Sequence, residues 1–198
     1  MIPYENVIVT DVDGVLLLWE HGFHMWMVSN GYKSTVNGFY NIEDKYGIDK
    51  DKADFLAQSF NESAAMKRLP PMKDAIKYVR KLHEEHGFVF HCITAIPNTR
   101  DMYEARLENL ENLFGKTAIE RLILCGSSKN KPHFLEEYRD TECLWIEDLS
   151  ANVKYGVDIG MKGILINHHY NKNDVNNFEH ARVNKWKEIY QIVTGEGD

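Results

Sequence analysis

Hydrophobic residues of the chain gather in five short runs, and the segments between them repeat apolar residues at helical spacing instead. Runs rich in Val, Ile, Leu and aromatic residues predict β-strands that are covered on both faces. We predict strands at residues 6–10, 88–93, 121–125, 143–146 and 163–167. One-sided apolar faces predict helices at residues 72–82, 103–114 and 183–193. The alternation predicts an α/β fold of βαβ units around a parallel sheet.

Residues 19–69 interrupt this alternation with frequent glycines and aromatic residues. Residues 51–66 have the spacing of a helix, which the pair Pro70-Pro71 would end. We expect a small helical insert over one edge of the sheet, while residues 1–18 and 70–198 form the core domain. The alternative is a long crossover that packs on the core and has no role as a lid.

Composition and charge exclude several classes of protein. The 198 residues are 43% hydrophobic and carry a formal net charge of −7, which is ordinary for a globular chain. The net negative charge disfavours a protein that coats duplex DNA, because contacts to phosphate groups need clustered Lys and Arg. No apolar run approaches the roughly 20 residues that span a bilayer. The acidic N-terminal segment, with Glu5 and Asp11, is unlike a secretory signal. We expect neither duplex nucleic acid nor a membrane as partner.

The cysteine pattern bears on the cellular compartment. Cys92, Cys125 and Cys143 are widely spaced, odd in number and each in or beside an apolar run. Such a set is not a disulfide framework, and no C-x-x-C pair indicates zinc. Buried reduced thiols are expected, which favours a cytoplasmic location.

The first candidate site follows the first predicted strand, in the sequence Asp11-Val12-Asp13-Gly14. Side chains at i and i+2 of an extended segment point the same way, so Asp11 and Asp13 can converge on one site. Ligands of open parallel sheets bind beyond the carboxyl ends of the strands. Mg²⁺ would relieve the repulsion between the two carboxylates. The alternative is an Asx turn after an edge strand.

Polar residues also follow the next two predicted strands. The hydroxyl of Thr94 and the backbone N–H groups from Ala95 onward could hold a phosphate, although Thr is also a frequent helix N-cap. Lys131 precedes Pro132, a favoured first helical residue, and therefore lies near a helix start at the same edge. Lys129 is a competing candidate for this position.

The fourth predicted strand ends in the acid pair Glu147-Asp148. Two adjacent acids after an apolar strand need a partner, and a divalent metal ion would serve both. The alternative for Asp148 is a cap for a helix at Ser150–Asp158. One active site accounts for all four strand ends more simply than four separate explanations do.

The motifs DVDGV, ITA, KxKP and WIEDLSAN, spread over residues 6–167, resemble the four signature motifs of the haloacid dehalogenase-like (HAD) phosphohydrolases. The resemblance implies a three-layer Rossmann-like core with a central parallel sheet and a small helical cap inserted after the first strand. Chain size, cap position, the Thr-Ala pair and the acid pair look most like the 5′(3′)-deoxyribonucleotidase branch. The implied activity is Mg²⁺-dependent hydrolysis of phosphate monoesters, with (deoxy)nucleoside monophosphates as substrates.

The resemblance also implies a role for each motif residue. Asp11 would be the nucleophile that forms an aspartyl-phosphate, and Asp13 would protonate the leaving oxygen and later deprotonate water. Thr94, with the backbone of Ala95 beside it, would bind the phosphoryl oxygens. Lys131 would offset the charge between Asp11 and the phosphate. The Mg²⁺ ligands would be the side chains of Asp11 and Asp148 and the carbonyl of Asp13.

Glu147 departs from the more usual Asp of the family's acid pair. Its longer side chain favours an indirect role in metal binding, through water. The two adjacent histidines His168 and His169 are interpreted as surface residues, because adjacent side chains diverge on a strand.

Substrate specificity is expected from the insert. Phe23, Trp26, Phe39 and Tyr40 could stack on a base or form a hydrophobic slot. The alternative is that they form the small core of the insert. His24 is a candidate for a substrate contact in this scheme, and an exposed surface position is the favoured interpretation.

The sequence leaves three hypotheses about the function open. The first is a phosphatase for nucleoside monophosphates, acting on a small-molecule phosphate monoester as a monomer or homodimer. The second keeps the chemistry and changes the substrate to a sugar phosphate, another small metabolite or a polynucleotide end. The third is a catalytically silent binding module on the same fold, since a fold alone does not establish a function. A receiver-type phosphoacceptor domain would need neither the insert nor the second acid of DxD.

Overall fold

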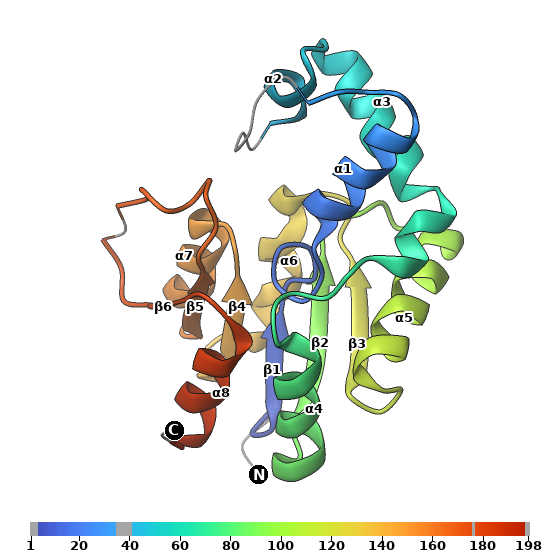
Figure 1. The fold of residues 1–198 in the computed structure, drawn as a ribbon. Coiled ribbons are helices and arrows are strands. Elements are labelled where there is room, and N and C mark those ends of the chain that lie inside the picture. Colours follow the sequence, from blue (N-terminus) through green and yellow to red (C-terminus); the bar gives the residue numbers. More distant parts are fainter. Residues whose placement is uncertain (1–3, 35–40, 176, 197–198) are drawn as a thin grey trace.

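The computed structural model describes residues 4–34, 41–175 and 177–196. Six strands of these residues form one parallel sheet in the order β3-β2-β1-β4-β5-β6 (Figure 1). The strands are β1 (Val7–Thr10), β2 (Val89–Thr94), β3 (Ile119–Leu124), β4 (Leu144–Glu147), β5 (Lys162–Ile166) and β6 (Ala181–Val183). Five of them match the predicted strands to within two residues at every end. The parallel α/β fold is therefore confirmed.

Helices cover both faces of the sheet and make the three-layer arrangement (Figure 1). One face carries α4 (Ala75–His86), α5 (Arg100–Phe114) and α8 (Trp186–Thr194). The other face carries α6 (Lys131–Leu135) and α7 (Ser150–Asp158), with the 3-10 helices η2 (Ser128–Asn130) and η3 (Glu136–Tyr138) beside α6. Alternate residues of β1 serve the two cores, since Ile8 packs on the first face and Val9 on the second.

Between β1 and α4 the chain forms α1 (Trp19–Ser29), α2 (Ile42–Tyr46), α3 (Lys50–Asn61) and the 3-10 helix η1 (Ala64–Arg68). Figure 1 shows these helices beyond the carboxyl ends of the strands. The single helix predicted at residues 51–66 is wrong in its second part. The α-helix ends at Asn61, and Ser63 caps η1 by accepting a hydrogen bond from Ala65 N.

The C-terminal prediction also needs a correction. The helix expected from residue 183 begins at Trp186, because Ala181–Val183 is the sixth strand and pairs in parallel with β5. Three residues are too few to show the alternation of a strand, and Val183 happens to fit the helical spacing of the residues that follow.

Two further expectations concern burial and membranes. All three cysteines are buried free thiols, as predicted. Across the described ranges, no helix combines the length and the apolar character needed to cross a membrane.

Candidate active site

The carboxyl ends of β1 and β4 bring three acids together. Because β1 and β4 are neighbours in the sheet, Asp11 after β1 lies beside Glu147 and Asp148 at the end of β4. The hydrogen bond from Asp11 N to Ile146 O, at 2.9 Å, extends the strand pairing to this point. One carboxylate oxygen from each acid lies within 4.8 Å of the other two, and all three residues are buried. The predicted convergence of the first and fourth strand ends is thus present.

Lys131 is the lysine that reaches these acids. It begins α6, is 1% exposed, and places Nζ 2.8 Å from Asp11 Oδ2 and 2.6 Å from Glu147 Oε1. Lys129 is exposed on η2. Burial alone would lower the pKa of Lys131, but Asp11 and Glu147 outweigh it and raise that pKa. The ammonium is therefore a permanent charge within the acidic cluster.

Both oxygens of Glu147 are occupied by protein donors. Oε1 accepts from Lys131 and from Asn152 Nδ2 at 2.6 Å, and Oε2 accepts from the backbone N–H groups of Asp148 and Leu149 at 2.7 and 2.8 Å. Burial pushes its pKa up, yet Lys131 and the backbone donors bring the net pKa below its usual value. Glu147 thus holds Lys131 and the start of α7 in place.

The pKa values of Asp11 and Asp148 are shifted in the opposite direction to that of Glu147. Burial raises the pKa of Asp11 to about 7, although Lys131 opposes this. Burial, reinforced by Glu147 and Asp11, raises the pKa of Asp148 well above its usual value. Three carboxylates face one ammonium here, a formal excess of two negative charges. Carboxylate oxygens with an excess of two negative charges fit a divalent cation such as Mg²⁺.

Asp13 lies apart from this cluster, paired with a different cation. Its Oδ2 accepts from Thr94 Oγ1 at 3.1 Å and from Arg106 Nη2 at 3.0 Å, and the same Nη2 lies 2.9 Å from Oδ1. Thr94 is fully buried, and its hydroxyl meets Asp13 rather than the cavity, which corrects the expectation that it faces a phosphate directly. Arg106, from the middle of α5, was not foreseen from the sequence.

Gly14 allows the Asp148 side chain to lie against the turn that follows Asp13. Its φ is +82°, a conformation that residues with a side chain rarely adopt. A Cβ at this position would lie 2.2 Å from Asp148 Oδ2, well inside van der Waals contact. The glycine of the DxDG motif therefore lets Asp148 lie directly against the turn that follows Asp13.

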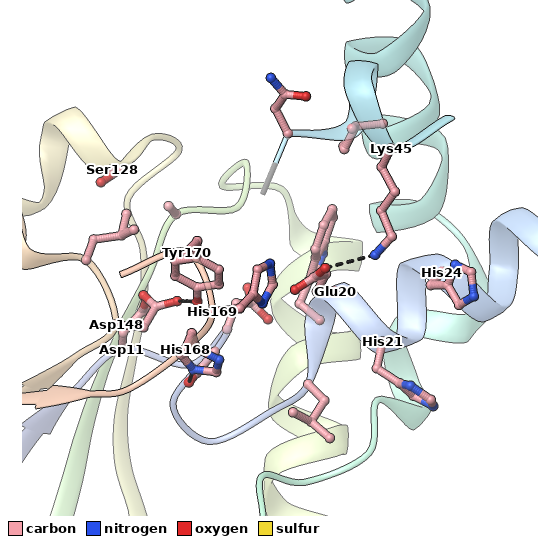
Figure 2. Close-up of a pocket in the computed structure, with 18 of the residues that line it drawn as sticks. Asp11, Glu20, His21, His24, Lys45, Ser128, Asp148, His168, His169 and Tyr170 are labelled. Atoms are coloured by element: carbon pink, nitrogen blue, oxygen red, sulfur yellow. Dashed lines mark hydrogen bonds and ion pairs between the residues drawn. The ribbon is translucent and has the colours of Figure 1, made fainter. Parts of the chain in front are cut away.

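The loop after β5 forms a further wall of the site. The hydroxyl of Tyr170 donates to the Asp148 carboxylate, and Asn171 Nδ2 donates to the Asp148 carbonyl at 2.7 Å. His168 Nε2 lies 2.7 Å from the Gly14 carbonyl, and burial lowers the pKa of its ring. His168 and His169 both line the cavity (Figure 2). His169 is exposed, as the sequence predicted, whereas His168 is only partly exposed.

A cavity of about 730 Å³ separates this edge of the sheet from the helices of residues 19–68. Asp11, Asp13 and Asp148 lie at its floor together with Ala95 and Lys131. Figure 2 shows the opposite side, where Glu20, His21, His24 and Lys45 project from α1 and α2. The ammonium of Lys45 pairs with Glu20 at 2.8 Å.

Two aromatic residues expected to contact substrate pack elsewhere. Phe23 is buried, with its ring stacked on Trp19 at a 5.0 Å centroid distance and edge-on to Phe60, and Trp26 packs against Phe60. Neither Phe23 nor Trp26 lines the cavity, because the helices of this segment bury them against one another. His24 does line the cavity, with Nδ1 2.9 Å from the Tyr46 hydroxyl. Phe39 and Tyr40 lie outside the described residues.

Solved structures similar to this one include HAD-like hydrolases. A haloacid dehalogenase-like hydrolase from Streptococcus pneumoniae superposes with a TM-score of 0.67 at 15% identity, over 96% of this chain and 98% of its own. A HAD hydrolase from Bacillus subtilis, solved bound to magnesium, gives 0.64 at 12% identity over 96% and 98%. A protein from Haemophilus somnus described as a predicted phosphoglycolate phosphatase gives 0.63 at 11% over 96% and 98%. These likenesses establish a HAD-like fold.

Sequence comparison adds one relative. No protein-family model matches the chain. An uncharacterized 32.4 kDa protein of Enterobacteria phage T4 is 25% identical over 167 residues. The match covers 77% of this chain, and the chain spans 57% of the length of that curated relative.

Proposed function

We propose that the protein is a Mg²⁺-dependent phosphomonoesterase in which Asp11 is the nucleophile. The observation that carries the proposal is the placement of Asp11 at the floor of a cavity, with its carboxylate 2.8 Å from the Lys131 ammonium and within 4.8 Å of an Asp148 oxygen. Phosphoryl transfer depends on positioning and charge neutralisation, and a carboxylate beside a buried ammonium supplies both. One neighbour of the fold is described as a predicted phosphoglycolate phosphatase and another was solved bound to magnesium, and both support the same proposal.

The side chains of Asp11 and Asp148 and the carbonyl of Asp13 would hold the ion. When bound, Mg²⁺ supplies positive charge that keeps Asp11 ionised and neutralises phosphoryl oxygens. Glu147 supports the ion indirectly, because both of its oxygens already accept hydrogen bonds from protein groups.

The reaction would proceed in two halves. An Asp11 oxygen attacks phosphorus, the bond from phosphorus to the leaving oxygen breaks, and Asp13 gives its proton to that oxygen. Water then attacks the aspartyl-phosphate while Asp13 takes a proton from it, and the Asp11 carboxylate and inorganic phosphate are regenerated. Lys131 stabilises the charge that accumulates between Asp11 and the phosphoryl group.

In this proposal residues 19–69 are a cap over a core of residues 1–18 and 70–198. The cap closes the side of the cavity from which the leaving group departs, so it sets the substrate. A cavity of about 730 Å³ is large enough for a nucleoside monophosphate, the leading substrate class. The polar groups that α1 and α2 present, Glu20, His21 and Lys45, favour a hydroxyl-rich sugar phosphate as the second candidate.

A substrate panel tests the proposal. The purified chain is assayed for release of inorganic phosphate from an aryl phosphate, deoxy- and ribonucleoside monophosphates, sugar phosphates and end-phosphorylated oligonucleotides, with Mg²⁺ or with EDTA. We expect Mg²⁺-dependent activity that EDTA abolishes, with the highest kcat/KM on a nucleoside monophosphate. Activity only on the aryl ester and sugar phosphates would make sugar phosphates, instead of nucleoside monophosphates, the substrate class. Inactivity on every ester would favour a silent binding module.

A further inference from the structure

Arg106 is a charged side chain in the interior of the protein. It lies on the buried face of α5, between Met102 and Leu110, and its side chain has no solvent exposure. Its Nη2 contacts both carboxylate oxygens of Asp13, whereas Nε and Nη1 have no hydrogen-bond partner among the described residues. The guanidinium is therefore fully desolvated, with two of its three nitrogens unsatisfied.

Such an arrangement is costly for stability. Removing a guanidinium from water carries a large desolvation penalty, and one carboxylate offsets that penalty only when the remaining donors are also satisfied. The neighbouring positions of the same helix face, Met102 and Leu110, are apolar and have no such cost. Packing alone thus gives no reason for a charge at position 106.

The contact does determine where the Asp13 carboxyl group lies. Nη2 is 2.9 Å from Oδ1 and 3.0 Å from Oδ2, and the Thr94 hydroxyl donates to Oδ2 from a second direction. Asp13 keeps 23% of its side chain exposed and lines the cavity. A protonated carboxyl group retains an acceptor oxygen, so Arg106 can hold Asp13 both with and without its proton.

We propose that Arg106 is a positioning residue that acts through Asp13. The inference rests on the proposed phosphatase reaction, in which Asp13 exchanges protons with the leaving oxygen and with water. A displacement of about 1 Å in a group that transfers protons costs on the order of 10² in rate. Arg106 holds Asp13 within that tolerance from a helix that does not itself line the cavity.

The test compares two substrates that differ in their need for a proton. An aryl phosphate with a weakly basic leaving oxygen departs unprotonated, whereas an alkyl phosphate such as glycerol phosphate needs a general acid. Both are measured as kcat/KM in Mg²⁺, a quantity that reports the first half of the reaction. For Arg106→Gln we expect a loss of about 10²-fold on the alkyl ester, within the usual range for general acid catalysis, and little change on the aryl ester. Arg106→Lys retains a positively charged nitrogen that can donate to Asp13 and should recover part of the alkyl activity.

Two controls separate positioning from folding. Arg100→Gln removes an exposed arginine of the same helix, whose partner is Glu104, and should leave both substrates unaffected. In an Asp13→Asn background, Arg106→Gln should cause no further loss of alkyl activity, because the two residues act as one unit.

The outcomes are distinct. Equal losses on both esters, or additive losses in the double variant, would assign Arg106 a structural role and overturn the inference. An unchanged ratio of alkyl to aryl activity in an active Arg106→Gln protein would overturn it as well. A wild-type protein inactive on both esters would overturn the proposed function, and the inference with it.

Discussion

The Lys131 ammonium lies 2.8 Å from the carboxylate of Asp11, and both groups are buried. This contact joins the helix after β3 to the end of β1, and Glu147 binds the same ammonium from β4. Lys131 therefore compensates negative charge that two separate segments bring into the interior.

Replacing Lys131 by Met should destabilise the protein. Asp11 and Glu147 would then be buried without their cation, and loss of one partner of a buried ion pair costs about 3–5 kcal/mol. The free energy of unfolding, from urea titration in EDTA, measures the effect. Lys129→Met is the matched control and should change it by less than about 0.5 kcal/mol, because Lys129 is exposed. Similar losses in both variants would contradict the buried arrangement.

Asp11→Asn should abolish phosphate release, since an amide cannot attack phosphorus and form the acyl-phosphate. Asp13→Asn should instead accumulate phosphoenzyme, because water is no longer deprotonated. Both are measured with a radiolabelled aryl phosphate, whose leaving oxygen departs without a proton, in Mg²⁺, by release of phosphate and by label retained on the protein. Asp158→Asn, an exposed acid paired with Lys154 on α7, is the control. A fully active Asp11→Asn protein would exclude Asp11 as nucleophile.

The acidic cluster predicts how stability depends on pH in the absence of metal. The pKa of folded Asp11 is raised from 3.8 to about 7, so its contribution to stability is complete below the unfolded value and is lost as the pH rises through about 7. Asp148 is shifted in the same direction. In EDTA, the stability of wild type relative to Asp11→Asn should therefore fall between about pH 4 and about pH 7.

Mg²⁺ should reverse this trend. Metal binding needs deprotonated carboxylates, so the increase in Tm on adding Mg²⁺ should grow across the same pH interval. Thermal melts of wild type and Asp11→Asn, each in EDTA and in Mg²⁺, provide the measurement. A Tm increase that is independent of pH, or equal in the two proteins, would argue against Asp11 as a ligand.

Tyr170→Phe should weaken Mg²⁺ binding without removing a ligand. The Tyr170 hydroxyl donates to the Asp148 carboxylate, and loss of such a supporting hydrogen bond typically costs at least about 10-fold in metal affinity. Isothermal titration calorimetry with Mg²⁺ gives the Kd. Tyr155→Phe removes an exposed hydroxyl that donates to Glu136, and it should leave the Kd unchanged. Equal Kd values for Tyr170→Phe and wild type would remove Tyr170 from the metal site.

Local sequence patterns were sufficient to predict the fold and the charged residues at the floor of the cavity. Strands that are covered on both faces are continuous apolar runs in the sequence, which is why they could be predicted. The polar residues that follow such strands meet at one edge of a parallel sheet. Asp11, Lys131 and Asp148 could therefore be assigned to one site from the sequence. β6 was not predicted, because three residues are too few to show a strand pattern. The nucleotidase branch stays a prediction.

The residues missed by sequence reasoning depend on tertiary contacts. Arg106 did carry a signal, since it lies three residues after Tyr103 and four before Leu110 on the apolar face of its predicted helix. A charge on a buried face needs a partner, but the sequence could not identify Asp13 as that partner. The Tyr170 hydroxyl reaches Asp148 from an irregular loop, which has no periodicity to read.

The position of β1 in the sheet also bears on how the chain is synthesised. β1 lies between β2 and β4, and it pairs Ile8 with Phe90 on one side and with Leu144 on the other. A ribosome delivers β4 long after β1 and β2, so one hydrogen-bonding edge of the nascent sheet stays open while the intervening residues are translated. Exposed strand edges recruit other chains. The central pairing of the sheet is therefore complete only once β4 has emerged from the exit tunnel.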